Sequence, residues 1–332
     1  MVANRSYAFA VRLLASDPGL KRNMQTIRTG VVGLGAIGVN HARIMAELPN
    51  AEFTAVYDER EEHARELAEK FGAKAAGSLD ELISMVDAAT VATPTVSHLA
   101  VGSALLQAGK HVLIEKPIAD NSEDAKALVD LADAKGVVLQ VGHIERFNPV
   151  LGQLEEHLSS PRFIESHRLS PFPNRSIDIG VVLDLMIHDI EIILHLVRSE
   201  IESIDAVGVP VLTRREDIAN ARIRFANGCV ANITASRISP ERLRKIRVFQ
   251  GDSYVSLDYQ AQEGELFRKQ GMEIVREAVI VEKDEPLKLE LAAFVDCATH
   301  GFQPKVSGSE AAAALKVAIE ITRMIEATGD GK

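Results

Sequence analysis

Residues 27–48 read IRTGVVGLGAIGVNHARIMAEL, and this stretch decides the fold. A short run rich in β-branched residues is followed by a glycine-rich turn and then by an amphipathic segment. This order is typical of the first unit of a dinucleotide-binding fold, because the glycines allow a tight turn and the helix N-terminus attracts a pyrophosphate. The residues expected to line the cofactor here are Gly33, Gly35, Ala36, Ile37 and Gly38.

An acidic residue stands at the distance that this fold uses. Asp58 follows Gly38 by 20 residues and ends the run FTAVYD. A carboxylate at that position binds the ribose hydroxyls of adenosine and repels a 2′-phosphate. Asp58 therefore favours NAD over NADP, although the neighbouring Arg60 leaves some room for the phosphate form.

Apolar runs of strand length alternate with helical stretches from residue 27 to residue 143. Their composition is typical of parallel strands that are buried on both faces. Five such units predict a Rossmann domain, a doubly wound parallel sheet of class α/β, over residues 27–143. Residues 1–26 are expected to be a poorly ordered extension. The five runs lie at residues 27–33, 52–58, 86–92, 111–115 and 137–142.

The pattern changes after His143, where strands come to dominate. Residues 144–305 are expected to form an α+β domain with a largely antiparallel open sheet and helices on one face, used for substrate binding and oligomerisation. Asn227-Gly228 predicts a hairpin between two of its strands. Residues 306–332 are expected to form a C-terminal helix that packs back on the Rossmann domain. The expected strands are 163–170, 201–209, 217–228, 228–237, 242–251, 252–260 and 272–282, and the expected helices are 149–158, 182–197 and 286–300.

Composition narrows the classes of partner. The formal net charge of −10 argues against nucleic acid or an anionic membrane surface. No apolar run is long enough to span a bilayer. Cys229 and Cys297 form no CxxC pair, which excludes a zinc ribbon or a thioredoxin-like motif. Free thiols in a cytoplasmic protein are expected, with one long-range disulfide as the alternative.

Polar residues follow two of the predicted strands at their carboxyl ends. Thr93-Pro94-Thr95 follows one strand, and Glu115-Lys116-Pro117 ends another. Ligands of open α/β sheets bind at this edge. A lysine after a buried strand is usually a solvated strand end, but Pro117 fixes the local backbone and could direct Lys116 inward.

A second group of residues lies on the helix predicted at 182–197. Asp184 and His188 are four residues apart and share one face, which Glu191 and His195 extend. Three interpretations stay open: a metal site, a buried histidine satisfied by a carboxylate, or a general base oriented by Asp184. Because there is no HExxH motif and no cysteine nearby, no metal is expected.

Arginine is unusually frequent in the second part of the chain. Residues 144–260 contain 13 arginines and one lysine within an acidic protein. Guanidinium groups suit bidentate capture of phosphate or carboxylate, so the group as a whole favours an anionic substrate. For any single arginine, pairing with a surface acid is the simpler explanation. Those placed at strand ends or loops are Arg146, Arg168, Arg175, Arg237, Arg242 and Arg244.

Taken together, GVVGLGAIGVNHARIM, VATPTVSH, LIEKP and DLMIHD resemble the Gfo/Idh/MocA family of sugar oxidoreductases. The resemblance implies that Lys116 hydrogen-bonds the reacting hydroxyl and the cofactor, and that His188, positioned by Asp184, is the acid/base. Whether Lys116 or His188 takes the proton stays open. Residues implied to line NAD beside those of the glycine loop and Asp58 are Thr93, Pro94, His98, Glu115 and Lys116.

Within the family, VGHIERFNPV, RLSPFPNRSIDIGVVLDLMIHDIEI and ITASRISPERLRKIRVFQ look like a subgroup that oxidises the 3-hydroxyl of UDP-N-acetylglucosamine. The implied product is a 3-keto sugar nucleotide that feeds amino-sugar synthesis for lipid A or surface polysaccharide, with an aminotransferase as functional partner and a homodimer or homotetramer as assembly. The expected substrate contacts are Arg146, Asn148, Arg175, Arg237 and His188.

Two other functions remain possible at this point. A dehydrogenase of a free polyol or sugar such as myo-inositol would need no arginine group, since a neutral ring carries no charge. A non-catalytic NAD(H)-sensing protein would need no reactive side chains. The joint presence of Lys116, Asp184 and His188 argues against the sensing protein.

Overall fold

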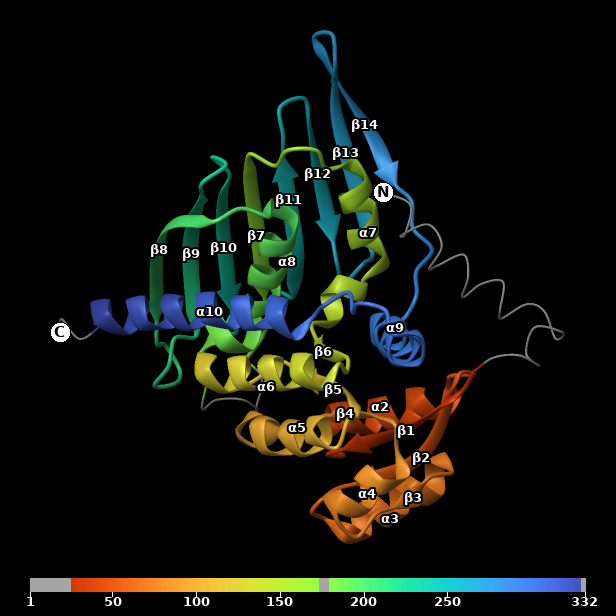
Figure 1. The fold of residues 1–332 in the computed structure, drawn as a ribbon. Coiled ribbons are helices and arrows are strands. Elements are labelled where there is room, and N and C mark those ends of the chain that lie inside the picture. Colours follow the sequence, from red (N-terminus) through yellow and green to blue (C-terminus); the bar gives the residue numbers. More distant parts are fainter. Residues whose placement is uncertain (1–24, 173–178, 330–332) are drawn as a thin grey trace, which may run out of the picture.

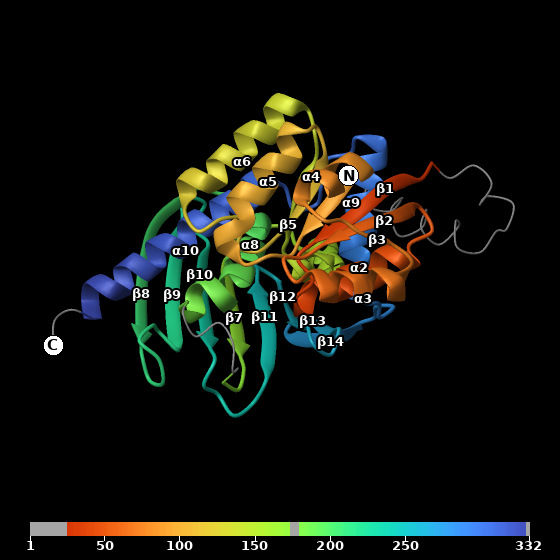
Figure 2. The ribbon, with the colours of Figure 1, turned by 90° about the horizontal axis from the view of Figure 1, so that it is seen from below.

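The structure is a computed structural model in which residues 25–172 and 179–329 are described. The predicted extension at 1–26 therefore lies almost wholly outside the described residues. Two sheets form the body of the protein, and Figure 1 shows the first with its helices below the second. Among the described residues, helices cover one face of the second sheet and leave its other face bare, as Figure 2 shows.

The first sheet has six parallel strands in the order β3-β2-β1-β4-β5-β6. This confirms the predicted doubly wound Rossmann domain. Every residue of β4 and β6 is buried, as expected for strands covered on both faces. The two-residue strand β3 was not predicted. The elements are β1 (Ile27–Val32), α2 (Ala36–Glu47), β2 (Ala51–Tyr57), α3 (Glu61–Phe71), β3 (Lys74–Ala75), α4 (Leu79–Met85), β4 (Ala88–Val91), η2 (Thr95–Ser97), α5 (His98–Gln107), β5 (His111–Glu115), α6 (Ser122–Lys135) and β6 (Leu139–Gly142).

The second sheet has eight strands in the order β14-β13-β12-β11-β7-β10-β9-β8. All neighbours are antiparallel except β7 and β10, which confirms a largely antiparallel sheet. The predicted hairpin joins β9 to β10, and Gly228 there has a φ of 82°. The strands are β7 (Phe163–Leu169), β8 (Ile201–Val209), β9 (Ile218–Phe225), β10 (Val230–Ser236), β11 (Leu243–Phe249), β12 (Ser253–Asp258), β13 (Glu263–Gln270) and β14 (Glu273–Val279).

The helices of the second part connect the two sheets. Helix α10 packs against α6 and β6 on one side and against α8 and β8 on the other, and Figure 2 shows it lying along both. One buried apolar cluster includes Ile114 of β5 as well as Ile190 and Ile233 of the second domain. The two domains therefore share a core. The helices are η3 (Ile144–Phe147), α7 (Pro149–His157), the π-helix η4 (Val182–Met186), α8 (Ile187–Val197), α9 (Pro286–His300) and α10 (Gly308–Gly329).

Three further observations bear on the sequence analysis. Cys229 and Cys297 are both buried and free, which removes the disulfide alternative. Within residues 25–172 and 179–329, no helix has the length and apolar character needed to cross a membrane. In the same residues, no group of three or more His, Cys, Asp and Glu side chains is arranged to hold a metal ion.

Candidate active site

The turn between β1 and α2 depends on its glycines for close backbone contact. Gly33 has a φ of 87°, and a Cβ there would lie 2.8 Å from the backbone of Ala92. A Cβ on Gly38 would overlap the carbonyl oxygen of Gly33. Gly35 differs from both, because nothing lies within 4 Å of the position its Cβ would take. The loop is thus tightly packed inside and open at its tip.

The open tip fits a dinucleotide. Gly35, Ala36 and Ile37 are consecutive exposed residues at the N-terminus of α2. This helix begins without a side-chain cap and has no acidic residue in its first turn. Its first N–H groups are therefore left for an anion such as a pyrophosphate.

Asp58 lies beside this loop. Its carboxylate accepts hydrogen bonds from the backbone N–H of Leu34 at 2.7 Å and from Nε of Arg60 at 2.9 Å. Partial burial opposes ionisation, but the hydrogen bonds from Arg60 and Leu34 outweigh it and lower the pKa of Asp58 to about 2. A stable negative charge therefore stands at the carboxyl end of β2.

His98 joins the two strand ends that the sequence singled out. Its Nδ1 is 2.9 Å from the carbonyl oxygen of Pro117, and its Nε2 is 3.0 Å from that of Thr93. The ring is buried, whereas Pro94 is exposed. His98 thus holds the turn after β4 against the cis Lys116-Pro117 peptide after β5.

Glu115 faces away from the open edge. One carboxylate oxygen accepts the backbone N–H of Lys116 at 3.2 Å, and the other lies 3.2 Å from Nε2 of His41. The same carboxylate packs on the backbone of Gly142, where a Cβ would lie 2.8 Å from Oε1. Through these contacts the Glu115 side chain supports the backbone of Lys116.

Lys116 reaches from the first domain to the second. Its Nζ donates to the carbonyl oxygen of Asp184 at 2.6 Å and lies 3.4 Å from that residue's Oδ1. Burial lowers the pKa of Lys116, and the neighbouring Asp184 and Glu115 carboxylates act against this shift. The sequence prediction that Lys116 points inward agrees with this geometry.

His188 lies in the same region. The ring is half-buried, and its Nδ1 has no hydrogen-bond partner among the described residues. Burial, and then the positive charges of Lys116 and Arg168, hold the pKa of His188 well below its usual range. The imidazole is therefore neutral and has a lone pair on one ring nitrogen, while the same surroundings disfavour its protonated form.

The sequence analysis missed His143, which follows β6. Its ring meets that of His188 edge-on with centroids 5.7 Å apart. Burial, together with Lys116 and Arg146, lowers the pKa of His143 to about 3. Both of its ring nitrogens lack a partner in the described structure. A lone histidine after a strand carries no sequence signal of such a position.

The helix that carries Asp184 and His188 departs from the expected geometry. Val182–Met186 is a π-helix, so residues four apart do not superimpose as they do on an α-helix. Asp184 pairs with Lys116, and the described residues show no hydrogen bond between Asp184 and His188. Glu191 instead pairs with Arg146, and His195 lies 3.2 Å from Glu155.

Two of the arginines expected to contact the substrate are buried in ion pairs within the protein. Arg146 is 1% exposed and forms a 2.5 Å ion pair with Glu191. Arg237 is fully buried and pairs with Asp217 at 2.8 Å. Both guanidinium groups have internal partners instead of the accessible position that the sequence interpretation required.

Asn148, a further expected contact, does not replace them. Asn148 is buried, caps α7 by accepting the N–H of Val150, and donates to the carbonyl oxygen of Tyr259. Arg175 lies outside the described residues. Among the described residues, the contact for an anionic group of the substrate must therefore be another side chain.

Arg237 and its neighbours hold the start of the π-helix. Nη1 of Arg237 donates to the carbonyl oxygen of Ile179 at 2.7 Å. The carboxylate of Glu216 accepts the N–H of Val182 at 3.3 Å and occupies the space where a Cβ on Gly180 would lie. Gly180 is thus required for this contact, which explains the glycine before the Asp184 motif.

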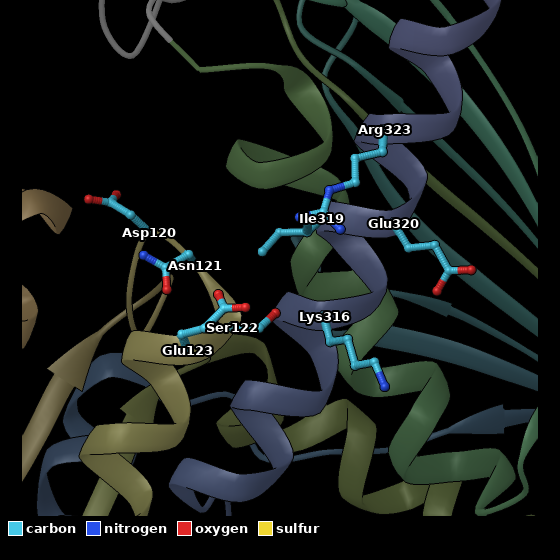
Figure 3. A pocket seen from close by; sticks show the side chains of 8 residues that line it. All are labelled: Asp120, Asn121, Ser122, Glu123, Lys316, Ile319, Glu320 and Arg323. Carbon is cyan, nitrogen blue, oxygen red and sulfur yellow. The ribbon is translucent and has the colours of Figure 1, made fainter.

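A groove that the sequence did not indicate lies between the N-terminus of α6 and α10. It has a volume of about 430 Å³, and Figure 3 shows its side chains. None of the residues predicted for the site lines it. Its lining mixes acidic and basic side chains and consists of Asp120, Asn121, Ser122, Glu123, Lys316, Ile319, Glu320 and Arg323.

Comparison with known proteins bears on both domains. The family profile described as "Oxidoreductase family, NAD-binding Rossmann fold" matches residues 27–143, and the "GFO/IDH/MocA C-terminal domain" matches residues 156–252. UDP-N-acetylglucosamine 3-dehydrogenase of Acidithiobacillus ferrooxidans is 38% identical over 90% of this chain and 99% of its own. Myo-inositol 2-dehydrogenase of Thermotoga maritima is 29% identical over 90% of this chain and 96% of its own.

Solved structures agree with these matches. A structure of the Acidithiobacillus ferrooxidans enzyme has a TM-score of 0.87 at 36% identity and covers 92% of this chain and 99% of its own. Levoglucosan dehydrogenase, solved with NADH and levoglucosan, shares the fold with a TM-score of 0.83 at 19% identity, over 91% of this chain and 98% of its own. These likenesses confirm the resemblance noted from the sequence: the chain belongs to the Gfo/Idh/MocA family of oxidoreductases.

Proposed function

We propose that this protein oxidises the 3-hydroxyl of UDP-N-acetylglucosamine to the 3-keto sugar nucleotide, with NAD+ as the oxidant. The observation that carries the reaction type is the contact of Lys116 with Asp184 beside the neutral imidazole of His188. The likeness to the Acidithiobacillus ferrooxidans enzyme over nearly the whole chain supports this substrate.

Lys116 is suited to stabilise the reacting oxygen. An ammonium group has three N–H donors, and two directions are taken by the carbonyl and carboxylate oxygens of Asp184. The third is available to the substrate hydroxyl, where a cation lowers the energy of the developing alkoxide. When bound, NAD+ supplies the hydride acceptor.

His188 is the proton acceptor in this proposal. Removing the hydroxyl proton must accompany the loss of hydride from the same carbon, so a base is needed beside Lys116. Lys116 is held by Asp184 as a donor, whereas the neutral imidazole of His188 has a lone pair that can take the proton. Since Nδ1 of His188 is buried, we propose that Nε2 is the atom that accepts the proton of the substrate hydroxyl.

NAD is the proposed form of the cofactor. The carboxylate of Asp58 stands beside the glycine loop with a pKa of about 2 and is ionised at physiological pH. A fixed negative charge there attracts ribose hydroxyls as hydrogen-bond donors and repels a 2′-phosphate. Arg60 is already engaged by Asp58, which reduces its ability to bind that phosphate.

We further propose that the protein acts in the cytoplasm as a homodimer or homotetramer, with an aminotransferase converting its ketone product for lipid A or surface polysaccharide. The bare face of the second sheet supports self-association, since aromatic rings line up across neighbouring strands. Phe249 and Tyr254 stack at 5.0 Å, and Tyr254 and Phe267 stack at 4.3 Å.

A coupled assay tests the activity. Purified protein is incubated with UDP-N-acetylglucosamine, NAD+, a sugar-nucleotide aminotransferase and glutamate, so that the ketone is removed and the equilibrium is drawn forward. We expect absorbance at the reduced nicotinamide band. Parallel reactions contain myo-inositol or N-acetylglucosamine. A signal with myo-inositol and none with the sugar nucleotide would replace the proposed substrate by a free polyol.

A further inference from the structure

Arg244 has a position that sets it apart from the buried arginines. It is the second residue of β11, and the residues on the same side of that strand, Ile246 and Val248, are fully buried beneath the helices. Side chains alternate between the two faces of a strand, so Arg244 belongs to the helix-covered face. Its side chain is nevertheless 39% exposed. Arg244 therefore lies where the helical layer no longer covers the sheet.

A chain of ion pairs connects Arg244 to the catalytic helix. Nη1 of Arg244 donates to Oε1 of Glu145 at 3.2 Å, and the same oxygen accepts from Arg168 at 2.9 Å. Arg168, directly opposite on β7, also binds Asp189 at 2.6 Å. Asp189 is the neighbour of His188 in the sequence. Arg244 thus faces the same part of the molecule as the proposed base.

The guanidinium of Arg244 has donors to spare. It has five N–H donors, and its contact with Glu145 is its one hydrogen bond within residues 25–172 and 179–329. Because Arg168 binds the same oxygen of Glu145, the single negative charge of this carboxylate is shared between two guanidinium groups. Burial and the nearby Arg168 and Arg242 lower the pKa of Arg244, while Glu145 and Asp189 act in the opposite direction. An anion placed here would relieve this repulsion between positive charges.

We propose that Arg244 binds the phosphate groups of the nucleotide-sugar substrate and so determines the preference for a sugar nucleotide over a free sugar. The proposal rests on the function proposed above and replaces Arg146 and Arg237 in this role. The diphosphate of such a substrate is attached at C1, two ring carbons from the oxidised C3. A phosphate site must therefore lie in the same region as the base, and the charge of Arg244 is among those that lower the pKa of His188. The forked guanidinium matches phosphate oxygens in pairs.

The strand offers a matched control in Arg247. It lies on the same strand but on the bare face of the sheet, with a side chain 49% exposed and a 3.6 Å pair to Glu165. We compare wild type with Arg244→Gln, Arg244→Lys and Arg247→Gln. For each, calorimetry gives the Kd of UDP and of inorganic pyrophosphate in the presence of NADH, and steady-state kinetics gives KM for UDP-N-acetylglucosamine. Fluorescence titration gives the Kd of NADH.

For Arg244→Gln we expect both the Kd of UDP and KM to rise about 10- to 100-fold, which is what losing a hydrogen-bonded charge contact costs. Arg244→Lys keeps the charge without the fork, so an intermediate rise is expected. Arg247→Gln and the Kd of NADH should not change. The lysine variant also guards against misfolding of the glutamine variant.

Three other outcomes bear on the phosphate site, and the first two distinguish it from the proposed function. If Arg244→Gln binds UDP as tightly as the wild type does, the assignment of Arg244 is overturned. The proposed oxidation of UDP-N-acetylglucosamine is not affected by that result. If the wild type does not oxidise that sugar but its pyrophosphate affinity depends on Arg244, the function falls and the phosphate site stands. If the wild type binds neither UDP nor pyrophosphate, the phosphate site is refuted.

Discussion

The two domains use charged side chains in opposite ways. In the first, the charged residues predicted from the sequence stand at the carboxyl ends of strands and are partly exposed, as Asp58 and Lys116 are. In the second, Arg146 forms a buried ion pair with Glu191. Arg237 forms another with Asp217. Residue type therefore predicts an accessible position where a backbone motif also fixes the location, and fails to do so where the direction of each side chain is unknown.

Replacing Arg237 tests this comparison most severely. Arg237→Met would leave the buried carboxylate of Asp217 without its ion-pair partner, and we expect the free energy of unfolding to fall by about 3–5 kcal/mol. The control Arg215→Met breaks an ion pair with Glu326 in which both side chains are half-exposed, and should cost less than about 1 kcal/mol. Urea denaturation measures both. Equal losses would show that the buried pair of Arg237 with Asp217 contributes no more to stability than an exposed pair does.

Lys116 lies where the two domains meet, and its replacement should abolish most activity. Lys116→Met removes the cation beside the reacting oxygen, so kcat should fall on the order of 10²- to 10³-fold at saturating NAD+. Lys126→Met, which breaks an exposed pair with Asp130, serves as control and should leave kcat unchanged. A normal kcat for the Lys116 variant would refute the inward, catalytic assignment.

His188 and His195 belong to the same helix and allow a similar contrast. His188→Ala removes the proposed base and should lower turnover on the order of 10²-fold while NAD binding stays intact. His195→Ala removes a side chain that lies against Glu155, so its turnover should change little. Initial rates of NADH formation distinguish the two. An unchanged rate in the His188 variant would take that residue out of the reaction.

The smallest effect is expected in the first domain, at Asp58. Asp58→Ala removes the repulsion of a 2′-phosphate and frees Arg60, so the ratio of kcat/KM for NAD to that for NADP should fall on the order of tenfold. Arg60→Ala is the matched control and should not favour NADP. If the ratio does not change, Asp58 is not at the ribose.

Much of the first domain could be predicted because its constraints are local. Gly33 and Gly38 are fixed by close backbone contacts, and short buried runs give the strands directly. Strand β3 was missed because two residues carry no pattern. In the second domain β13 was missed, since its residues EGELFRKQ are mostly polar and half-exposed.

The residues of the candidate site could be singled out from the sequence, but the contacts between them could not. Lys116 and His188 were identified by type and position, yet the π-helix brings Asp184 to Lys116 and not to His188. His143 gave no signal, because its role depends on a ring 45 residues away in sequence. Arg244 could be separated from the buried arginines only once the register of β11 and β7 was known.

The contact between Lys116 and Asp184 has a consequence for motion. The two residues are 68 apart in sequence and belong to different domains, so any hinge movement that parts the domains also changes the distance between Nζ and the Asp184 carbonyl. Because the two domains also share one buried apolar cluster, this contact is one of several that keep Lys116 and Asp184 at a fixed separation.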